Sequence, residues 1–148
     1  MSKVAFIFPG QGSQKVGMGL DLANEYAVCK EIFEKADERL EFSLSEIIFS
    51  GPAETLKKTE NTQPALLTTS IAIYSLIKEH GITADYVAGH SLGEYSALVA
   101  AQAMSFEDAV YTVRKRGLFM EEAVPFGQGA MAAVLGMDRD QIIIKTIS

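Results

Sequence analysis

One serine in this sequence has the neighbours that a nucleophile requires. Ser91 lies in Gly89-His90-Ser91-Leu92-Gly93, which matches the G-x-S-x-G pattern of a nucleophile elbow. The pattern needs a strand before it and a helix after it, and we expect both, over residues 86–88 and 92–103. Glycines flank the serine because a Cβ would collide with backbone in so tight a turn. We predict that Ser91 is a nucleophile at a helix N-terminus, where N–H groups favour negative charge. The alternative is a structural turn.

The two histidines of the chain are poorly placed to activate this serine. His90 adjoins Ser91, and a side chain next to the nucleophile on a tight turn points away from it, whereas triad partners come from distant sequence. We expect His90 to pack or hydrogen-bond locally. His80 ends an expected helix, where a positive charge suits the C-terminal dipole. A Ser–His pair is therefore not completed within the chain.

An arginine falls on the apolar face of the helix expected over residues 105–124. Arg116 lies within a stripe of apolar side chains at helical spacing: Phe106, Ala109, Val113, Met120 and Val124. A buried guanidinium needs an anionic partner, and its fork suits a carboxylate. Gly117 weakens the helix by roughly 1 kcal/mol, which indicates a close approach of some other group. Alternatively, Arg116 extends to water or pairs with an internal acid such as Glu121.

A glycine-rich loop, Pro9-Gly10-Gln11-Gly12-Ser13-Gln14, follows the first expected strand. It lacks the lysine of G-x-x-x-x-G-K-[ST] and the spacing of G-x-G-x-x-G, which disfavours nucleotide binding. If the first strand lies beside residues 86–88, both loops open at the carboxyl edge of one parallel sheet. The backbone N–H of Gln11 could then face Ser91 as an oxyanion-hole donor. The alternative is a flexible surface loop.

The elements that must position these residues alternate between strand and helix. Short apolar runs predict strands over residues 3–8, expected to be buried, and 86–88. Periodicity predicts helices over residues 20–29, 30–40, 45–49, 62–80, 92–103 and 105–124. We expect Thr62 to cap its helix with Pro64 in the first turn, and Ser105 with Asp108 to form a capping box. The order predicts an α/β fold with parallel strands.

The last part of the chain has a different pattern. Pro125-Phe126-Gly127 ends the preceding helix, and we expect a strand over 128–135 and a helix from Asp138 to the C-terminus. That helix has no C-cap, and its apolar run Ile142-Ile143-Ile144 needs something to bury it. We therefore expect the chain to be truncated.

Composition excludes several classes of protein. The chain has 148 residues, 48% hydrophobic and 22% charged, which is ordinary for a globular domain. Its net charge of −6, with scattered basic residues, argues against a nucleic-acid partner. The single cysteine, Cys29, fits a reducing compartment, and we expect it to be a small hydrophobe on a helix. A signal peptide and a membrane span are both missing from the pattern. We expect a soluble, cytoplasmic protein with no membrane partner.

Four blocks of the sequence, in order and at matching spacing, resemble the malonyl-CoA:acyl carrier protein transacylases. The acyltransferase domains of polyketide and fatty acid synthases are close relatives of that family. The blocks are Phe8-Pro9-Gly10-Gln11-Gly12-Ser13-Gln14, Asn61-Thr62-Gln63-Pro64-Ala65, Gly89-His90-Ser91-Leu92-Gly93-Glu94-Tyr95-Ser96-Ala97 and Arg116-Gly117. The resemblance implies a hydrolase-like parallel-sheet core with the nucleophile elbow over residues 1–124. It further implies the start of an inserted ferredoxin-like small subdomain over residues 125–148.

The same resemblance implies roles for particular residues. Ser91 would be the nucleophile, and the backbone N–H groups of Gln11 and Leu92 would form the oxyanion hole. Arg116 would hold the malonyl carboxylate. Gln63 would shape the pocket wall, although a capping or packing role at the start of its helix is equally open.

The implied reaction transfers a malonyl group from malonyl-CoA to the phosphopantetheine thiol of acyl carrier protein, through a malonyl-serine, for fatty acid biosynthesis. The thioester is already activated, so we expect no metal and no cofactor. The family's histidine base lies beyond residue 148, and the chain is expected to need that C-terminal half. Two alternatives are a non-catalytic binding fragment and a serine esterase or thioesterase, which would have no use for Arg116.

Overall fold

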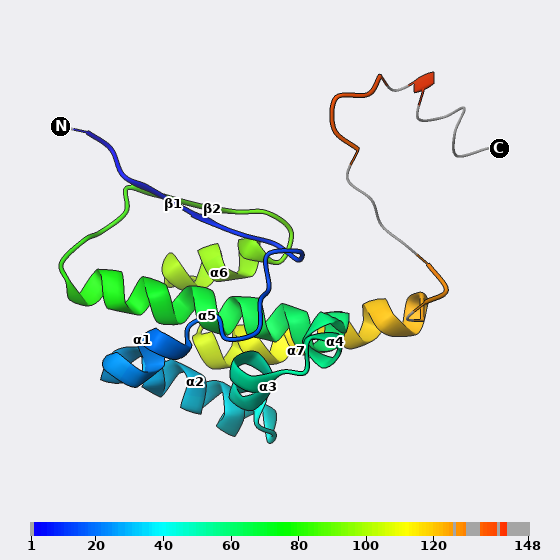
Figure 1. The fold of residues 1–148 in the computed structure, drawn as a ribbon. Coiled ribbons are helices and arrows are strands. Elements are labelled where there is room, and N and C mark those ends of the chain that lie inside the picture. The colour runs from blue at the N-terminus through cyan, green and yellow to red at the C-terminus, as the bar shows by residue number, and fades with distance from the viewer. Residues whose placement is uncertain (1, 126, 130–133, 139, 142–148) are drawn as a thin grey trace.

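The computed structural model of the chain describes residues 2–125, 127–129, 134–138, 140 and 141 (Figure 1). Its elements follow one another as strand, five helices, strand and two helices within the part described. Their bounds are β1 Ala5–Phe8, α1 Leu20–Glu25, α2 Ala27–Leu40, α3 Leu44–Ser50, α4 Ala53–Lys57, α5 Thr59–Glu79, β2 Tyr86–Gly89, α6 Gly93–Ala100 and α7 Phe106–Ala123. The α/β class predicted from the sequence is confirmed.

The two strands form a small parallel sheet. Ala5 pairs with Tyr86, and Phe8 pairs with Gly89 at the other end. The loops that follow β1 and β2 therefore leave from the same edge, as predicted. Asp85 joins the strands at the opposite end, where its carboxylate accepts hydrogen bonds from the Val4 N–H and the Lys3 ammonium, both at 2.9 Å. The Val4 N–H, and then Lys3, lower the pKa of the Asp85 carboxyl.

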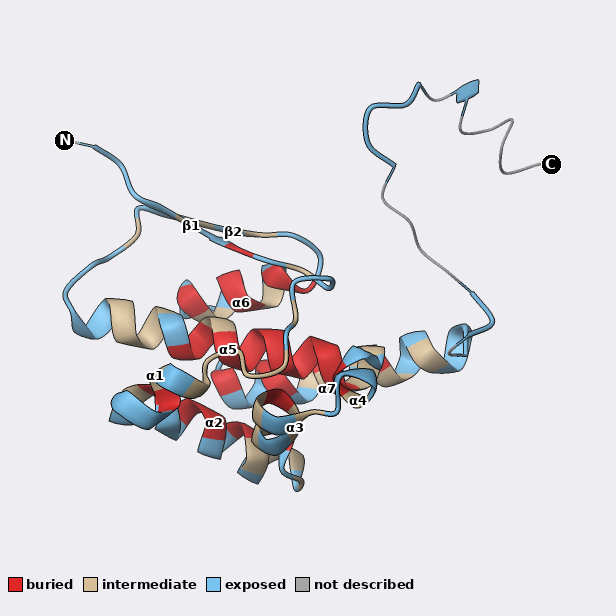
Figure 2. Cartoon of the chain, in the orientation of Figure 1, coloured by how far each residue is buried: buried red, intermediate tan, exposed pale blue. Residues whose placement is uncertain are grey.

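The expectation that the first strand is buried is wrong for this chain. Phe8 is the one buried residue of β1, where it packs against α6. Ile7 is 78% exposed, and Tyr86 on β2 is 62% exposed. Figure 2 shows the sheet mostly pale blue, above the buried faces of α5 and α6. The described helices cover one face of the sheet, whereas strands of a parallel sheet are normally covered on both.

The core surrounds α5, which packs against α2 on one side and α7 on another. Every residue from 61 to 69 is buried, and so are Ile71 and Ala72, so this part of α5 is enclosed on all sides. Cys29 of α2 is fully buried in this core, with its thiol 3.4 Å from the Ala72 carbonyl. Burial, and then the charge of Glu79, raise the pKa of the Cys29 thiol. The cysteine is therefore an inert core residue, as expected.

Three helix boundaries differ from the sequence prediction by several residues. The break between α1 and α2 falls at Tyr26, which is extended (φ −121°, ψ 120°), rather than near residue 30. α5 begins at Thr59, so Thr62 is not its cap. The Thr62 hydroxyl instead donates to the Leu56 carbonyl, inside the core. α6 ends at Ala100, and Gln102 beyond it has a left-handed backbone (φ 60°).

Other local predictions are confirmed. α3 spans the expected short helix with one further residue at each end. Gly81 follows the end of α5 with a φ of 77°, a conformation that favours glycine. Ser105 caps α7, and its hydroxyl accepts a hydrogen bond from the Asp108 N–H at 3.1 Å.

The predictions for the last part of the chain lie mostly outside the described residues. The expected strand over 128–135 has residues 128, 129, 134 and 135 described, and these have no strand pairing. Residues 140 and 141 are helical, and the rest of the helix expected from Asp138 lies outside the described part. None of the described helices has the length and apolar character needed to span a bilayer.

Candidate active site

Ser91 lies on a strained turn between β2 and α6. Its φ of 53° is left-handed, which is uncommon for a residue with a side chain and typical of functional turns. A Cβ on Gly89 would lie 1.9 Å from the carbonyl carbon of Gly93, and a Cβ on Gly93 would lie 2.2 Å from the Phe8 carbonyl oxygen. Both glycines are thus required by the close passage of backbone, as the sequence pattern predicted.

This crowding predicts that Gly93→Ala destabilises the protein. The added methyl would collide with the Phe8 carbonyl oxygen, so we expect a loss of about 3 kcal/mol in the free energy of unfolding. Gly81→Ala is the matched control, because its Cβ would meet open space and only its positive φ is unfavourable, costing about 1–2 kcal/mol. Urea denaturation measures both. Equal losses for the two variants would contradict the steric account of the elbow.

Side chains from the elbow, α7 and α5 lie together beside the Ser91 hydroxyl. Arg116 of α7 donates from one terminal nitrogen, Nη2, to Ser91 Oγ at 3.1 Å. Its other terminal nitrogen donates to Gln63 Oε1 of α5 at 2.7 Å. Gln63 is only 1% exposed, and its amide nitrogen lies 3.3 Å from the Met120 sulfur. The structure therefore joins the predicted nucleophile, the predicted carboxylate ligand and Gln63 in one chain of hydrogen bonds.

The environment of Arg116 differs from the one predicted. The apolar stripe is buried at Phe106, Ala109 and Val113, but Met120 is 36% and Val124 54% exposed. Arg116 itself is half-buried, with its guanidinium carbon 5.9 Å from the centre of the Tyr95 ring. Its acceptors named above are a neutral amide and a neutral hydroxyl, so neither cancels the charge of the guanidinium.

The close approach inferred at Gly117 is confirmed, and the approaching group is backbone. A Cβ on Gly117 would lie 2.7 Å from the Glu60 Cα and 2.8 Å from the Thr59 carbonyl oxygen. α5 and α7 therefore touch at their backbones, one turn from the Gln63–Arg116 hydrogen bond. This contact brings the two helices close enough for that bond.

The glycine-rich loop packs against the elbow. A Cβ on Gly10 would lie 2.8 Å from the His90 carbonyl oxygen, and the His90 N–H donates to the Phe8 carbonyl at 3.2 Å. The loop is held by its own hydrogen bonds, including Ser13 Oγ to the Gly10 carbonyl at 2.9 Å. These contacts disfavour a freely flexible loop. Gln11 is exposed, with its side-chain amide 3.3 Å from the Thr59 hydroxyl.

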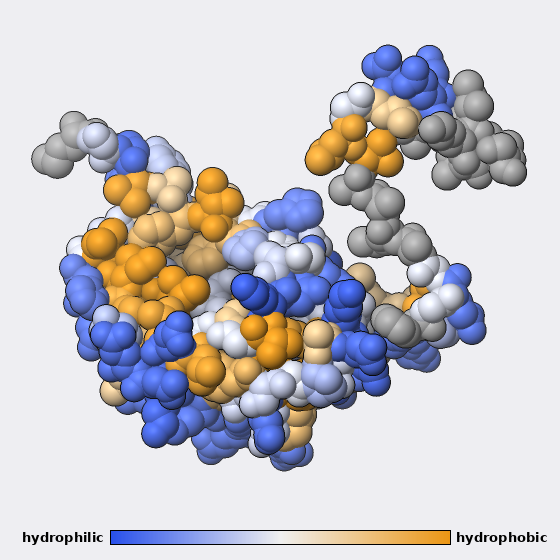
Figure 3. Space-filling model, viewed as in Figure 1, coloured by the Kyte–Doolittle hydropathy of each residue, from blue (hydrophilic) through white to orange (hydrophobic). Residues whose placement is uncertain are grey.

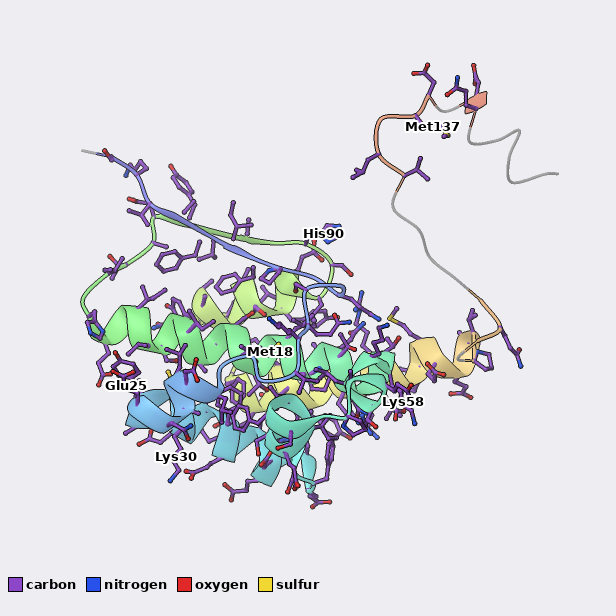
Figure 4. All side chains as sticks on the ribbon, in the orientation of Figure 1. Met18, Glu25, Lys30, Lys58, His90 and Met137 are labelled. Atoms are coloured by element: carbon purple, nitrogen blue, oxygen red, sulfur yellow. The ribbon has the colours of Figure 1, made fainter. Side chains whose placement is uncertain are left out.

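His90 is exposed and projects outward from the turn (Figure 4). Its ring lies beside Gly10, so its contact is local, as predicted. His80 hydrogen-bonds the Leu76 carbonyl at the end of α5, before β2, whereas the elbow follows β2. Neither histidine is brought to Ser91 by a hydrogen bond that the structure records.

Arg114 and Asn61 were not predicted from the sequence as part of the site. Arg114 is half-buried against α5, with hydrogen bonds to the Glu60 carbonyl and Asn61 Oδ1. The signal that could have found it is Pro64, because a proline beyond the first turn of a helix leaves one backbone carbonyl without its helical donor.

Comparisons with known proteins agree on one family. Residues 5–146 match the family described as acyl transferase domain. The malonyl CoA-acyl carrier protein transacylase of Bacillus subtilis is 65% identical over 142 residues, which cover 96% of this chain and 45% of that protein. The protein of the same name from Escherichia coli O157:H7 is 54% identical over 139 residues, covering 93% of this chain and 45% of its own. The chain spans about half the length of the curated relatives it matches.

Solved structures give the same result. The acyl-carrier-protein-S-malonyltransferase of Bartonella henselae superposes with a TM-score of 0.89 at 44% identity, covering 97% of this chain and 47% of that one. A malonyl-transacylase solved in complex with a type II PKS acyl-carrier protein superposes with a TM-score of 0.88 at 46% identity, covering 95% and 46% of the two chains. Since the family match takes in both the elbow and the helix of Arg116, this chain belongs to the acyl transferase domain family.

Proposed function

We propose that this chain carries the nucleophile and the carboxylate-binding arginine of a malonyl-CoA:acyl carrier protein transacylase. The observation that carries the proposal is the 3.1 Å hydrogen bond from Arg116 Nη2 to Ser91 Oγ. A fixed cation beside a nucleophilic serine suits an acyl group that ends in a carboxylate. The names of the relatives from Bacillus subtilis and Escherichia coli O157:H7 support the same activity.

In the first half of the reaction, Ser91 Oγ attacks the thioester carbonyl of malonyl-CoA. The backbone N–H groups of Gln11 and Leu92 would donate to the oxyanion that forms, and one such donor is typically worth ~3 kcal/mol. Leu92 directly follows Ser91 at the start of α6, and the Gln11 loop packs against the same turn. The C–S bond then breaks, coenzyme A leaves as the thiol, and malonyl-Ser91 remains.

In the second half, the phosphopantetheine thiol of acyl carrier protein attacks the malonyl-serine ester. The C–O bond to Ser91 breaks, the hydroxyl regains its proton, and the malonyl group leaves as a thioester. Both halves need a base, which by the family resemblance is a histidine outside this sequence. The thioester is already activated, so acyl transfer as written has no redox step.

Arg116 and Gln63 would set the choice of acyl group. The malonyl carboxylate would replace the Ser91 hydroxyl as an acceptor of Arg116, while Gln63 holds the other guanidinium nitrogen. The capping role considered for Gln63 is disfavoured, because Gln63 lies four residues inside α5 and its side chain bonds α7. A neutral acyl group would leave the guanidinium without a charged partner in the pocket.

The finer architecture is part of the same proposal: a hydrolase-like core over residues 1–124 and the start of a ferredoxin-like subdomain over 125–148. The exposed sheet supports it. An apolar groove of about 400 Å³ lies between β1 and α5, and Figure 3 shows apolar side chains gathered on this face. Met18, labelled in Figure 4, contributes to its wall. We propose that the C-terminal half of the enzyme covers this groove and the free edge of β1.

An uncovered apolar face predicts self-association of the chain on its own. Ile7 is 78% exposed on β1, next to the groove. We expect light scattering after size exclusion to show oligomers that Ile7→Lys reduces, because a charge on an exposed strand opposes edge pairing. Lys35→Ile is the control, because it makes the opposite change, from charged to apolar, at an exposed position on α2. It is expected to leave the oligomers that form through the sheet unchanged. A monodisperse monomer before any substitution would contradict the prediction.

The sequence also fits two other functions. A serine esterase or thioesterase would hydrolyse the ester, and a binding fragment would not turn over. A chimera in which this chain replaces the matching 142 residues of the Bacillus subtilis relative distinguishes them. Transfer predicts parallel double-reciprocal lines for malonyl-CoA and acyl carrier protein, the pattern of a ping-pong reaction. Release of free malonate at the same rate without carrier protein would favour hydrolysis.

A further inference from the structure

Helix α5 contains a proline at a position that costs it a backbone hydrogen bond. In an α-helix each N–H donates to the carbonyl four residues earlier, so the N–H of residue 64 would donate to the Glu60 carbonyl. Pro64 lacks an N–H and its ring crowds that carbonyl. It also disfavours the helical conformation of the preceding residue, and that residue is Gln63. The helix is thus weakened where it presents Gln63 to Arg116.

Arg114 of α7 supplies a donor at this gap. Its Nη1 lies 2.7 Å from the Glu60 carbonyl oxygen and 2.6 Å from Asn61 Oδ1. Asn61 is 5% exposed, and its amide nitrogen donates to the Thr55 carbonyl at 2.8 Å. A single guanidinium therefore has two partners on α5. One is the Glu60 carbonyl, which Pro64 leaves without a helical donor, and the other is the Asn61 side chain, which ties α5 to the preceding helix, α4.

Other contacts hold the Arg114 guanidinium in place. Its central carbon lies 4.9 Å from the centre of the Phe42 ring, a cation–π arrangement. Burial lowers the pKa of Arg114, and the nearby Glu60 carboxylate raises it. The backbone contact at Gly117 keeps α7 close enough for the side chain to reach α5. Arg114 and Arg116 are two residues apart, which is about 200° around the helix. Their side chains therefore reach α5 on either side of the backbone contact at Gly117.

We propose that Arg114 is a positioning residue for the site. It replaces the hydrogen bond that Pro64 cannot make, fixes the first turns of α5, and so holds Gln63 where it orients Arg116 toward Ser91. Its effect on substrate choice rests on the function proposed above, whereas its effect on α5 does not.

The test is a double-substitution cycle between Arg114 and Pro64. Arg114→Met removes the donor and keeps an unbranched side chain, and Pro64→Ala returns an N–H to α5. We expect backbone amides at the start of α5 to exchange hydrogen about tenfold faster in Arg114→Met, the effect of losing a hydrogen bond to a charged group. Pro64→Ala combined with Arg114→Met should restore most of the protection. Arg39→Met is the control, since that guanidinium lies over the Tyr111 ring instead of α5.

The chimera gives the second readout, the ratio of kcat/KM for malonyl-CoA to that for acetyl-CoA. We expect Arg114→Met to lower this ratio about tenfold, with acetyl transfer little changed, and the double variant to recover it. A purely structural residue would lower both rates together.

The two readouts separate the possible failures. Unchanged exchange in Arg114→Met, or a double variant no better than the single one, would overturn the role of Arg114 in α5. Faster exchange with an unchanged ratio would overturn its role in positioning the site. A chimera without malonyl preference before any substitution would refute the proposed function, and the exchange cycle would still decide the role of Arg114 in α5.

Discussion

Ser91→Ala in the chimera is expected to lower the rate of malonyl transfer by roughly 10⁴-fold or more, because the covalent route disappears with the nucleophile. Ser91 occupies the strained elbow position, with a φ of 53° and its hydroxyl 3.1 Å from Arg116. The variant should keep its fold, since alanine tolerates the same backbone about as well as serine. Steady-state transfer to acyl carrier protein measures the loss.

Ser75→Ala is the control for this change, because Ser75 lies on α5 toward the end remote from Gln63. It should retain full activity. A Ser91→Ala chimera that transfers malonyl at more than a few per cent of the original rate would refute nucleophilic catalysis by Ser91.

Arg116→Gln is expected to change which acyl group the enzyme accepts. Loss of the guanidinium removes the partner of the malonyl carboxylate, so kcat/KM for malonyl-CoA should fall about 10²–10³-fold, the loss expected when one partner of a buried charge pair is removed. Transfer from acetyl-CoA should hold steady or rise, because an acetyl group has no carboxylate for the guanidinium to bind. The ratio of the two kcat/KM values is the measurement.

The neighbouring Lys115→Met serves as the matched control. Its ammonium lies over the exposed Tyr111 ring, 5.4 Å from the ring centre, on another side of α7. It should leave the ratio unchanged. Equal losses of malonyl and acetyl transfer in Arg116→Gln would mean that the arginine supports the fold of the pocket and does not select the carboxylate.

The sequence predicted the elbow because one of its constraints is local. The clash at Gly89 is local, because a Cβ there would meet the Gly93 carbonyl, whereas a Cβ on Gly93 would meet the Phe8 carbonyl of the neighbouring strand. The parallel pairing of β1 and β2 also followed from the alternation of strands and helices. Arg116 was found from helical spacing, although its face proved half-exposed.

The remaining features depend on tertiary contacts that a linear pattern does not contain. Threonine is a residue type that often caps helices, but the Thr62 hydroxyl donates a hydrogen bond to the Leu56 carbonyl in the core. The helix itself starts earlier, at Thr59. Arg114 looked like a surface residue because its acceptors are 53 and 54 positions away in the chain. The exposure of β1 was missed because an apolar run predicts the need for burial and not whether a neighbouring layer is present.

The most direct test of the account is peptide mapping by mass spectrometry after the chimera is incubated with malonyl-CoA in the absence of carrier protein. The account predicts a malonyl ester on the peptide that contains Ser91, discharged by adding acyl carrier protein and lost in Ser91→Ala. A folded chimera that takes up no malonyl group, or that carries it on a residue other than Ser91, would contradict the account.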